Sequence, residues 1–222
     1  MAGLRTTADV DAWNELLPSE CTWAAVADGM GGHAAGEHAS RIAIAAIADG
    51  IAHVTSERAF VDLVRFANRR IFQAMHAEAG RNRMGCTIVS VTLREGTAIV
   101  VNVGDSRAYK WSNGRLDLLS RDHTIETTSS TRRIHALTQS LGGVPYEIPI
   151  SPHAMRLSFG PSDALLLCSD GLTDMVDHAS MVRTLHAEPN QPASALVEAA
   201  LSAGGRDNVT AVVIGPEQQT FV

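Results

Sequence analysis

The stretch AVADGMGGHAAGEH, residues 25–38, ends a hydrophobic run at Asp28 and places glycine at four of the next eight positions. A carboxylate beside an apolar strand is costly to bury unless another group offsets its charge. Glycine lets the backbone turn sharply and come close to a bound group. The stretch therefore predicts a buried strand, a tight corner with a functional carboxylate, and a helix that begins after His33.

Composition and charge exclude several classes of protein. The chain has 222 residues, is 45% hydrophobic and carries a formal net charge of −6, which is typical of a globular protein and argues against nucleic-acid or acidic-membrane binding. No run approaches the roughly 18 apolar residues of a membrane span, and residues 1–13 lack the apolar stretch of a signal peptide. Three cysteines without CxxC spacing indicate reduced thiols, so we expect a cytoplasmic protein.

Apolar spacing outlines the order of helices and strands. The predicted strands cover residues 21–28, 86–93, 97–103, 106–111, 164–169 and 208–214. The predicted helices cover residues 34–54, 56–80, 172–186 and 192–203. The polar segment 121–138 has few apolar anchors and predicts a surface loop. This order indicates an α+β fold with much antiparallel sheet rather than a regular βαβ alternation.

Two more acidic residues stand at strand ends, in the same way as Asp28. Asp170 follows the run ALLLCS, and Asp207 precedes the strand of GGRDNVTAVVI. A lone Asp-Gly pair is usually a turn, but three such positions are harder to explain in that way. Only Arg107 and Arg206 lie close to them in the sequence. Bound cations would offset the whole group, and oxygen ligands suit hard ions such as Mg²⁺ or Mn²⁺.

Two further carboxylates extend this group. Asp105 lies in a tight turn between strands in VNVGDSRAYKW, residues 101–111. Asp174 lies four residues after Asp170, which places the two on the same side of a helical turn. If the five carboxylates converge, they predict a site for two or three metal ions.

Seven stretches, in order along the chain, resemble the metal-dependent serine/threonine protein phosphatases of type 2C in their bacterial form. The stretches are VADGMGGHAAGE, GCTIVSVTL, VNVGDSRAYKW, RDHT, LTQSLGG, LLLCSDGLTDMV and GGRDNVTAVVI. The resemblance implies a central β-sandwich of two antiparallel sheets, flanked by helices on both sides, with metals in a cleft at one edge. Because it covers nearly the whole chain, we expect residues 1–222 to form a single catalytic domain.

The resemblance also assigns metal ligands. It implies that Asp28 bridges two metals and that Gly29 lends its carbonyl oxygen to one of them. Asp170 and Asp207 would complete the ligands of the other. The positions of a third, weaker metal in bacterial members correspond to Asp105 and Asp174.

The implied reaction is hydrolysis of phosphoserine and phosphothreonine in proteins, opposing a serine/threonine kinase. Two metals about 3.5–4 Å apart would lower the pKa of a bridging water, and the resulting hydroxide would attack phosphorus in line with the leaving oxygen. The metals and an arginine would offset the charge on the phosphoryl oxygens. We therefore expect an enzyme that takes phosphoprotein substrates and acts as a monomer.

The N-terminus departs from the family pattern, which opens with an arginine followed by Asn-Glu-Asp or a relative of it. This chain has LRTTADVDAWN at residues 4–14, in which Arg5 is the candidate phosphate clamp. Counted from Arg5, Asp9 falls on the Glu position, and counted back from DAW, Asp11 falls on the Asp position. We favour Asp11 as the catalytic acid that holds water at the metals and keep Asp9 as a second candidate.

Other features leave an alternative function open. The segment 125–137 is short for the flap that family members place beside the active site, which indicates an open cleft or a site completed by a partner. Together with the N-terminal departure, it would fit a catalytically weak, phosphatase-like binding or sensing module. The five retained aspartates favour the active enzyme. The spacing of His33 and His38 places them on different helix faces and argues against a zinc pair.

Overall fold

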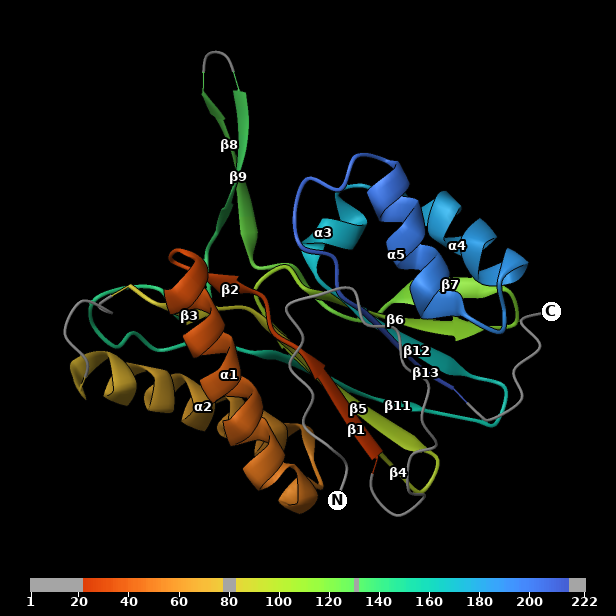
Figure 1. The fold of residues 1–222 in the computed structure, drawn as a ribbon. Helices are drawn as coiled ribbons and strands as arrows, with labels where there is room; N and C mark the ends of the chain where they lie inside the picture. Colours follow the sequence, from red (N-terminus) through yellow and green to blue (C-terminus); the bar gives the residue numbers. More distant parts are fainter. Residues whose placement is uncertain (1–21, 78–82, 130–131, 216–222) are drawn as a thin grey trace.

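The computed structural model describes residues 22–77, 83–129 and 132–215, which form two antiparallel sheets stacked face to face with helices on both outer faces (Figure 1). The first sheet has the order β1 (Thr22–Val26), β4 (Ile88–Arg94), β5 (Thr97–Val103), β11 (His153–Ser158). The second has the order β13 (Ala211–Ile214), β12 (Ala164–Cys168), β6 (Arg107–Ser112), β7 (Arg115–Leu118). This arrangement is the predicted α+β sandwich.

Helices and two small sheets complete the described chain. The helices are α1 (His33–Gly50), a 3₁₀ turn η1 (Ile51–His53), α2 (Glu57–Ala77), α3 (Asp170–Thr173), α4 (His178–Ala187) and α5 (Pro192–Ser202). One small sheet joins β10 (Leu141–Gly142), β3 (Gly85–Cys86) and β2 (Gly29–Met30). The other is a hairpin of β8 (Thr124–Ser129) and β9 (Arg132–Leu137).

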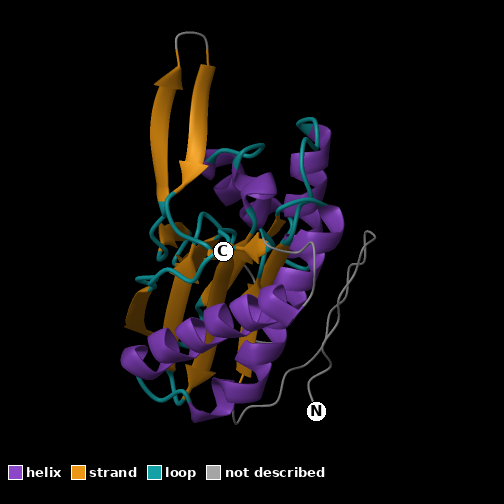
Figure 2. Cartoon of the chain, turned by 90° about the vertical axis from the view of Figure 1, so that its left-hand side faces the viewer, coloured by secondary structure: helices purple, strands orange, loops and turns teal. Residues whose placement is uncertain are grey.

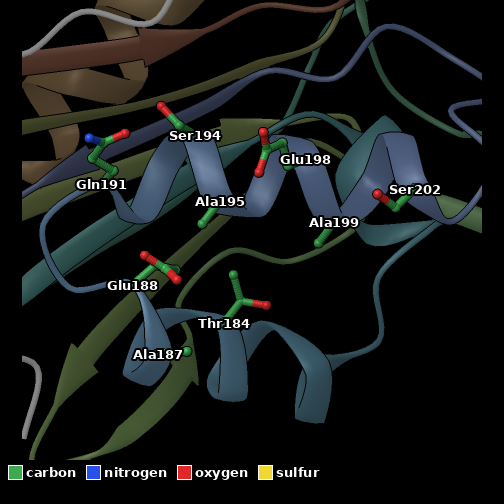
Figure 3. A pocket seen from close by; sticks show the side chains of 9 residues that line it. All are labelled: Thr184, Ala187, Glu188, Gln191, Ser194, Ala195, Glu198, Ala199 and Ser202. Atoms are coloured by element: carbon green, nitrogen blue, oxygen red, sulfur yellow. The ribbon is translucent and has the colours of Figure 1, made fainter.

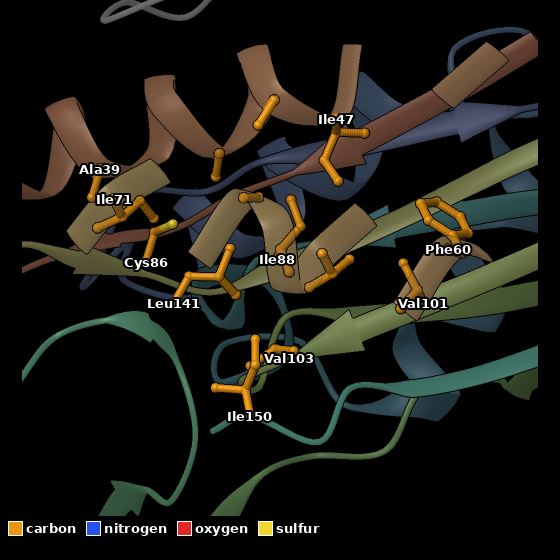
Figure 4. Packing of buried hydrophobic residues seen from close by; sticks show 14 of the residues in the cluster. Ala39, Ile47, Phe60, Ile71, Cys86, Ile88, Val101, Val103, Leu141 and Ile150 are labelled. Carbon is orange, nitrogen blue, oxygen red and sulfur yellow. The ribbon is translucent and has the colours of Figure 1, made fainter. Parts of the chain in front are cut away.

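The alternation of side chains along the strands builds three apolar layers. On β4, Ile88 packs under α1 and α2, whereas Val89 faces the second sheet. On β12, Leu165 faces the first sheet and Leu166 packs under α4 and α5. Figure 4 shows the first layer, in which side chains from α1 and α2 lie over those of β4 and β5. Because both of its faces are covered, β12 is a continuous apolar run, ALLLC, whereas β4 also buries Ser90 and Thr92.

Several element boundaries differ from the sequence prediction. The predicted helix 172–186 is two helices, because Asp177 accepts a hydrogen bond from the Ser180 N–H at 2.7 Å and caps a new start for α4. The predicted strand 208–214 begins only at Ala211. The edge strands β7 and β11 were not predicted, because each buries little of its surface and lacks a strong apolar pattern.

The predicted surface loop at 121–138 is wrong for most of its length. Its residues pair from Thr124 with Leu137 to Ser129 with Arg132, and the resulting hairpin projects from the sheets in both views (Figures 1 and 2). Threonine and isoleucine favour strands even in a polar segment, so β-propensity was the signal that polarity concealed. Among the helices that the structure describes, none is long and apolar enough to cross a membrane.

A salt bridge between Asp163, in the turn from β11 to β12, and Lys110 of β6 is expected to make the stability of the protein depend on pH. Asp163 accepts hydrogen bonds from the Gly160 N–H at 2.7 Å and contacts Lys110 Nζ at 2.8 Å. Burial alone would raise the pKa of Asp163, but the Gly160 N–H and the Lys110 ammonium lower it below its usual 3.8. Because the folded-state pKa is the lower one, the stabilisation is present above about pH 4 and is lost as the pH falls further.

We therefore expect Asp163→Asn to lower the free energy of unfolding by about 1–2 kcal/mol at pH 7. Urea denaturation of wild type and variant should show this difference shrinking below about pH 4, where the wild-type carboxylate begins to protonate. Asp117→Asn removes an exposed ion pair with Arg115 and should change stability by less than about 0.5 kcal/mol. A difference for Asp163→Asn that is independent of pH would contradict the assignment.

Candidate metal centre

The fold brings the ends of six strands, three from each sheet, to one edge of the sandwich. Val26 pairs with Val89, and Ile88 pairs with Val103, so β1 ends beside the start of β4 and the end of β5. In the second sheet, Cys168 at the end of β12 pairs with the first residues of β6 and β13. The predicted residues Asp28, Asp105, Asp170 and Asp207 follow or precede these strand ends. The turn that carries Asp105 also connects the two sheets.

The electrostatics show that these carboxylates lie near one another. Burial raises the pKa of Asp28 to about 7, and the charge of Asp170 is the next contribution, followed by those of Asp207 and Asp105. Burial and the charge of Asp170 also raise the pKa of Asp105 to about 6. The pKa of Asp170 is raised as well, mainly by burial; a hydrogen bond with the Asp28 side chain lowers it in part, and the charges of Asp174 and Asp207 raise it further. All five predicted carboxylates therefore interact.

In the described ranges, no arginine or lysine forms an ion pair with these carboxylates. Arg107, one of the two nearby arginines, is instead committed to Asp122, with three N···O contacts of 3.1, 3.0 and 2.6 Å. Burial opposes the charge of Arg107, but the hydrogen bonds to Asp122 dominate and raise its pKa. Within the residues that the structure describes, the buried Oδ1 atom of Asp170 has no hydrogen-bond partner.

These observations fit a hard divalent ion. The donors are oxygen atoms, the unpartnered Asp170 Oδ1 can serve as a ligand, and the mutual repulsion would be relieved by positive charge. In the described part of the chain, no group of three or more His, Cys, Asp or Glu side chains is already gathered around one point as a ligand set. The fit therefore rests on charge and on the unpartnered oxygen rather than on a preformed cage.

Thr87 connects the segment that carries Asp28 with the turn that carries Asp105. The sequence analysis did not identify this residue. The Asp28 N–H donates to Thr87 Oγ1 at 3.0 Å, and the Thr87 N–H donates back to the Asp28 carbonyl at 2.8 Å. Thr87 Oγ1 also hydrogen-bonds to Ser106 Oγ at 2.7 Å, next to Asp105. The sequence signal that could have identified this contact is a pair of hydroxyl residues, Thr87 and Ser106, next to apolar strands; the structure shows that both are buried.

The glycines after Asp28 allow the start of α1 to pack closely against the backbone next to Asp28. A Cβ atom at Gly29 would lie 2.4 Å from the carbonyl carbon of Gly36, and one at Gly36 would lie 2.6 Å from that of Gly29. The start of α1 therefore packs directly against the corner that carries Asp28. Gly31 has a φ of 100°, a conformation that favours glycine, where the chain turns toward this helix.

A similar close approach fixes Asp207. A Cβ atom at Gly171 would lie 2.2 Å from the Asn208 carbonyl oxygen, so α3 abuts the loop before β13. Ser169 Oγ donates to that same oxygen at 3.3 Å and accepts from the Thr210 N–H at 3.1 Å. These contacts hold Asp207 beside Asp170.

Two hollows lie on the second-sheet side of the molecule. The larger, about 450 Å³, lies between α4 and α5 and includes none of the five aspartates in its lining (Figure 3). The smaller, about 330 Å³, is lined by Gly171, Asp174, Met175, Arg206 and Asp207, and so adjoins the carboxylate cluster. The smaller hollow is part of the site because two of the predicted carboxylates, Asp174 and Asp207, line it.

The predicted residues Arg5, Asp9 and Asp11 lie outside the described residues.

Comparison with known proteins gives one consistent answer. The family model for protein phosphatase 2C matches residues 8–203. The serine/threonine phosphatase stp of Listeria innocua is 31% identical and covers 85% of this chain and 82% of its own. The serine/threonine protein phosphatase PstP of Mycobacterium tuberculosis is 34% identical over 85% of this chain, which matches 39% of PstP.

Solved structures agree. A crystal structure of the M. tuberculosis phosphatase PstP/Ppp superimposes with a TM-score of 0.76 at 32% identity and covers 88% of both chains. The catalytic domain of PstP in complex with two manganese ions has a TM-score of 0.74 at 31% identity, over 88% of this chain and 90% of that one.

An α+β sandwich with a cluster of partly buried carboxylates at its edge fits a metal-dependent phosphatase. With these matches, the chain belongs to the protein phosphatase 2C family, in its bacterial form, and its activity is that of a metal-dependent protein serine/threonine phosphatase. The family resemblance drawn from the seven sequence stretches is thereby confirmed.

Proposed function

We propose that Asp28, Gly29, Asp170 and Asp207 hold two divalent ions, Mg²⁺ or Mn²⁺, for the hydrolysis of phosphoserine and phosphothreonine. The observation that carries this proposal is the buried, unpartnered Asp170 Oδ1 within a set of mutually repelling carboxylates. The two manganese ions of the PstP catalytic domain support the number and the kind of ion. When bound, such ions lower the pKa of water and offset charge on a phosphoryl group.

A third ion is proposed at Asp105 and Asp174. The pKa of Asp105 is raised by burial, then by Asp170, with Asp174 contributing repulsion, so these side chains share one electrostatic field. Asp9 is a candidate ligand or water-binding group at this centre, as in the sequence analysis.

The remaining roles fall to side chains that bind substrate and orient water. Arg5 is the proposed clamp, because a guanidinium forms paired hydrogen bonds with phosphoryl oxygens. Asp11 is proposed to accept hydrogen bonds from the attacking water and so to orient it. The two described cysteines are poor nucleophiles, since both are buried and burial raises the pKa of the Cys168 thiol to about 12. Hydrolysis then proceeds by direct attack of water.

Further properties complete the proposal. Residues 1–222 form one catalytic domain, which is a cytoplasmic monomer and opposes a serine/threonine kinase. The hairpin of β8 and β9 occupies the position of a shortened flap, because its first strand begins at Thr124, the last residue of RDHT, and its second ends at Leu137, the first residue of LTQSLGG.

The test is release of phosphate from a phosphothreonine peptide with and without millimolar Mn²⁺. We expect turnover only with the metal, and Arg5→Ala should lower kcat/KM by about 10–100-fold because the clamp is removed. Arg115→Ala, at an exposed ion pair on β7, should leave the rate unchanged. If calorimetry shows that Mn²⁺ binds while no peptide is hydrolysed, the binding or sensing module becomes the better description.

A further inference from the structure

We propose that Arg206 and the cavity beside the carboxylate cluster bind an acidic side chain of the substrate, close in sequence to the phosphorylated residue. This inference rests on the proposed function, because it extends the same site toward the peptide. It assigns Arg206 as a residue that determines substrate specificity.

The cavity lies at the margin of the carboxylate cluster, because Asp174 and Asp207 line it. Its other lining residues are Gly171 of α3, Met175 just after that helix, and Arg206 in the loop before β13, whereas Asp28, Asp105 and Asp170 are absent from its lining. A phosphoryl group bound at the carboxylate cluster would therefore leave this space for a neighbouring part of the peptide. A volume of about 330 Å³ has room for one acidic side chain.

The charges of the lining favour an anionic occupant. Arg206 is exposed and has no ion pair with any carboxylate in the described ranges, although it adjoins Asp207 and shares the cavity with Asp174. Both aspartates are proposed metal ligands, so bound ions would offset their charges. Arg206 would then remain as an uncompensated guanidinium, whose planar donors suit a carboxylate.

Contacts on both sides hold the backbone of Arg206 in place. Before it, the Gly205 N–H donates to the Ala200 carbonyl at 3.1 Å, which ties the loop to the end of α5. After it, the Asn208 carbonyl oxygen accepts from Ser169 Oγ at 3.3 Å. Met175 adds an apolar wall to the cavity, which reduces the access of water to a bound ion pair. Arg206 is therefore presented to the cavity by an ordered loop rather than by a free end.

The test uses pairs of phosphothreonine peptides that differ at a single position, which carries Glu in one peptide and Gln in the other. The varied position is one of the two residues before, or one of the two residues after, the phosphothreonine. For wild type with Mn²⁺, we expect kcat/KM to be about tenfold higher for the Glu peptide at one of these positions. Arg206→Gln should abolish this preference, and Arg206→Glu should reverse it in favour of a Lys peptide. Arg183→Gln, at an exposed arginine of α4, should retain the wild-type preference.

A binding measurement gives a second readout. Fluorescence anisotropy with non-hydrolysable phosphonate versions of the same peptides should show the same loss of preference in Arg206→Gln. Because each result is a ratio between two peptides, a general loss of folded enzyme does not mimic it. Equal hydrolysis of the Glu and Gln peptides by wild type, or an unchanged preference in Arg206→Gln, would overturn this inference alone. If wild type hydrolyses no peptide with Mn²⁺, the proposed function fails first and this inference fails with it.

Discussion

Asp170→Asn is expected to lower kcat for a phosphothreonine peptide by about a thousandfold or more, while the protein remains folded. Asp170 carries the unpartnered Oδ1 atom, and its charge contributes to the raised pKa of Asp28. Asparagine has the same shape, but it replaces one carboxylate oxygen by an NH₂ group that does not ligate a hard cation. The substitution therefore removes a ligand without opening a cavity.

The same substitution should have the opposite effect on the metal-free protein. Because burial and neighbouring aspartates disfavour a charge at this position, a neutral amide relieves repulsion. Thermal unfolding in a chelator should then show Asp170→Asn to be at least as stable as wild type, whereas added Mn²⁺ should stabilise wild type more than the variant. Asp117→Asn, on exposed β7, serves as the matched control for both measurements. Substantial Mn²⁺-dependent turnover in Asp170→Asn would show that this residue is not a ligand.

Gly36→Ala is expected to destabilise the protein by about 2–4 kcal/mol, although helix propensity alone predicts a gain of about 1 kcal/mol. Gly36 lies in α1, where alanine is the better helix former. The added Cβ, however, would lie 2.6 Å from the Gly29 carbonyl carbon and 2.7 Å from the Met30 nitrogen. Both are backbone atoms, so relief requires a shift of the corner that carries Asp28. The steric term therefore outweighs propensity.

Activity should fall together with stability in this variant. A displaced corner moves Asp28 relative to Asp170, so we expect kcat/KM to drop by about tenfold or more in the fraction that remains folded. Urea denaturation and peptide hydrolysis measure the two effects. Gly160→Ala is the matched control, because its nearest atom would be 3.6 Å away, an ordinary contact. A Gly36→Ala protein as stable and active as wild type would contradict the close packing of α1 against the corner.

Parts of the fold and the site were predictable because local patterns carry them. The run TAIVVNV is β5 in full, and the helical spacing from Phe60 to Ile71 lies within α2. Four aspartates of the cluster were recognisable because each adjoins a predicted strand end, and Asp174 was recognisable because it lies four residues after Asp170. The hairpin 124–137 was not predicted, because it pairs polar strands with each other rather than with a core.

The sequence by itself determined the alternation of apolar residues, the strands and helices that follow from it, and the family to which the chain belongs. Only the tertiary structure decided which charges meet. Arg107 and Arg206 look equivalent in the sequence, but the first pairs with Asp122, 15 residues away along the chain, and the second lines the cavity. The physical reason is that hydrogen bonds and close backbone contacts, such as those of Thr87 with Asp28 and of Gly29 with Gly36, depend on distances between segments that no local pattern encodes.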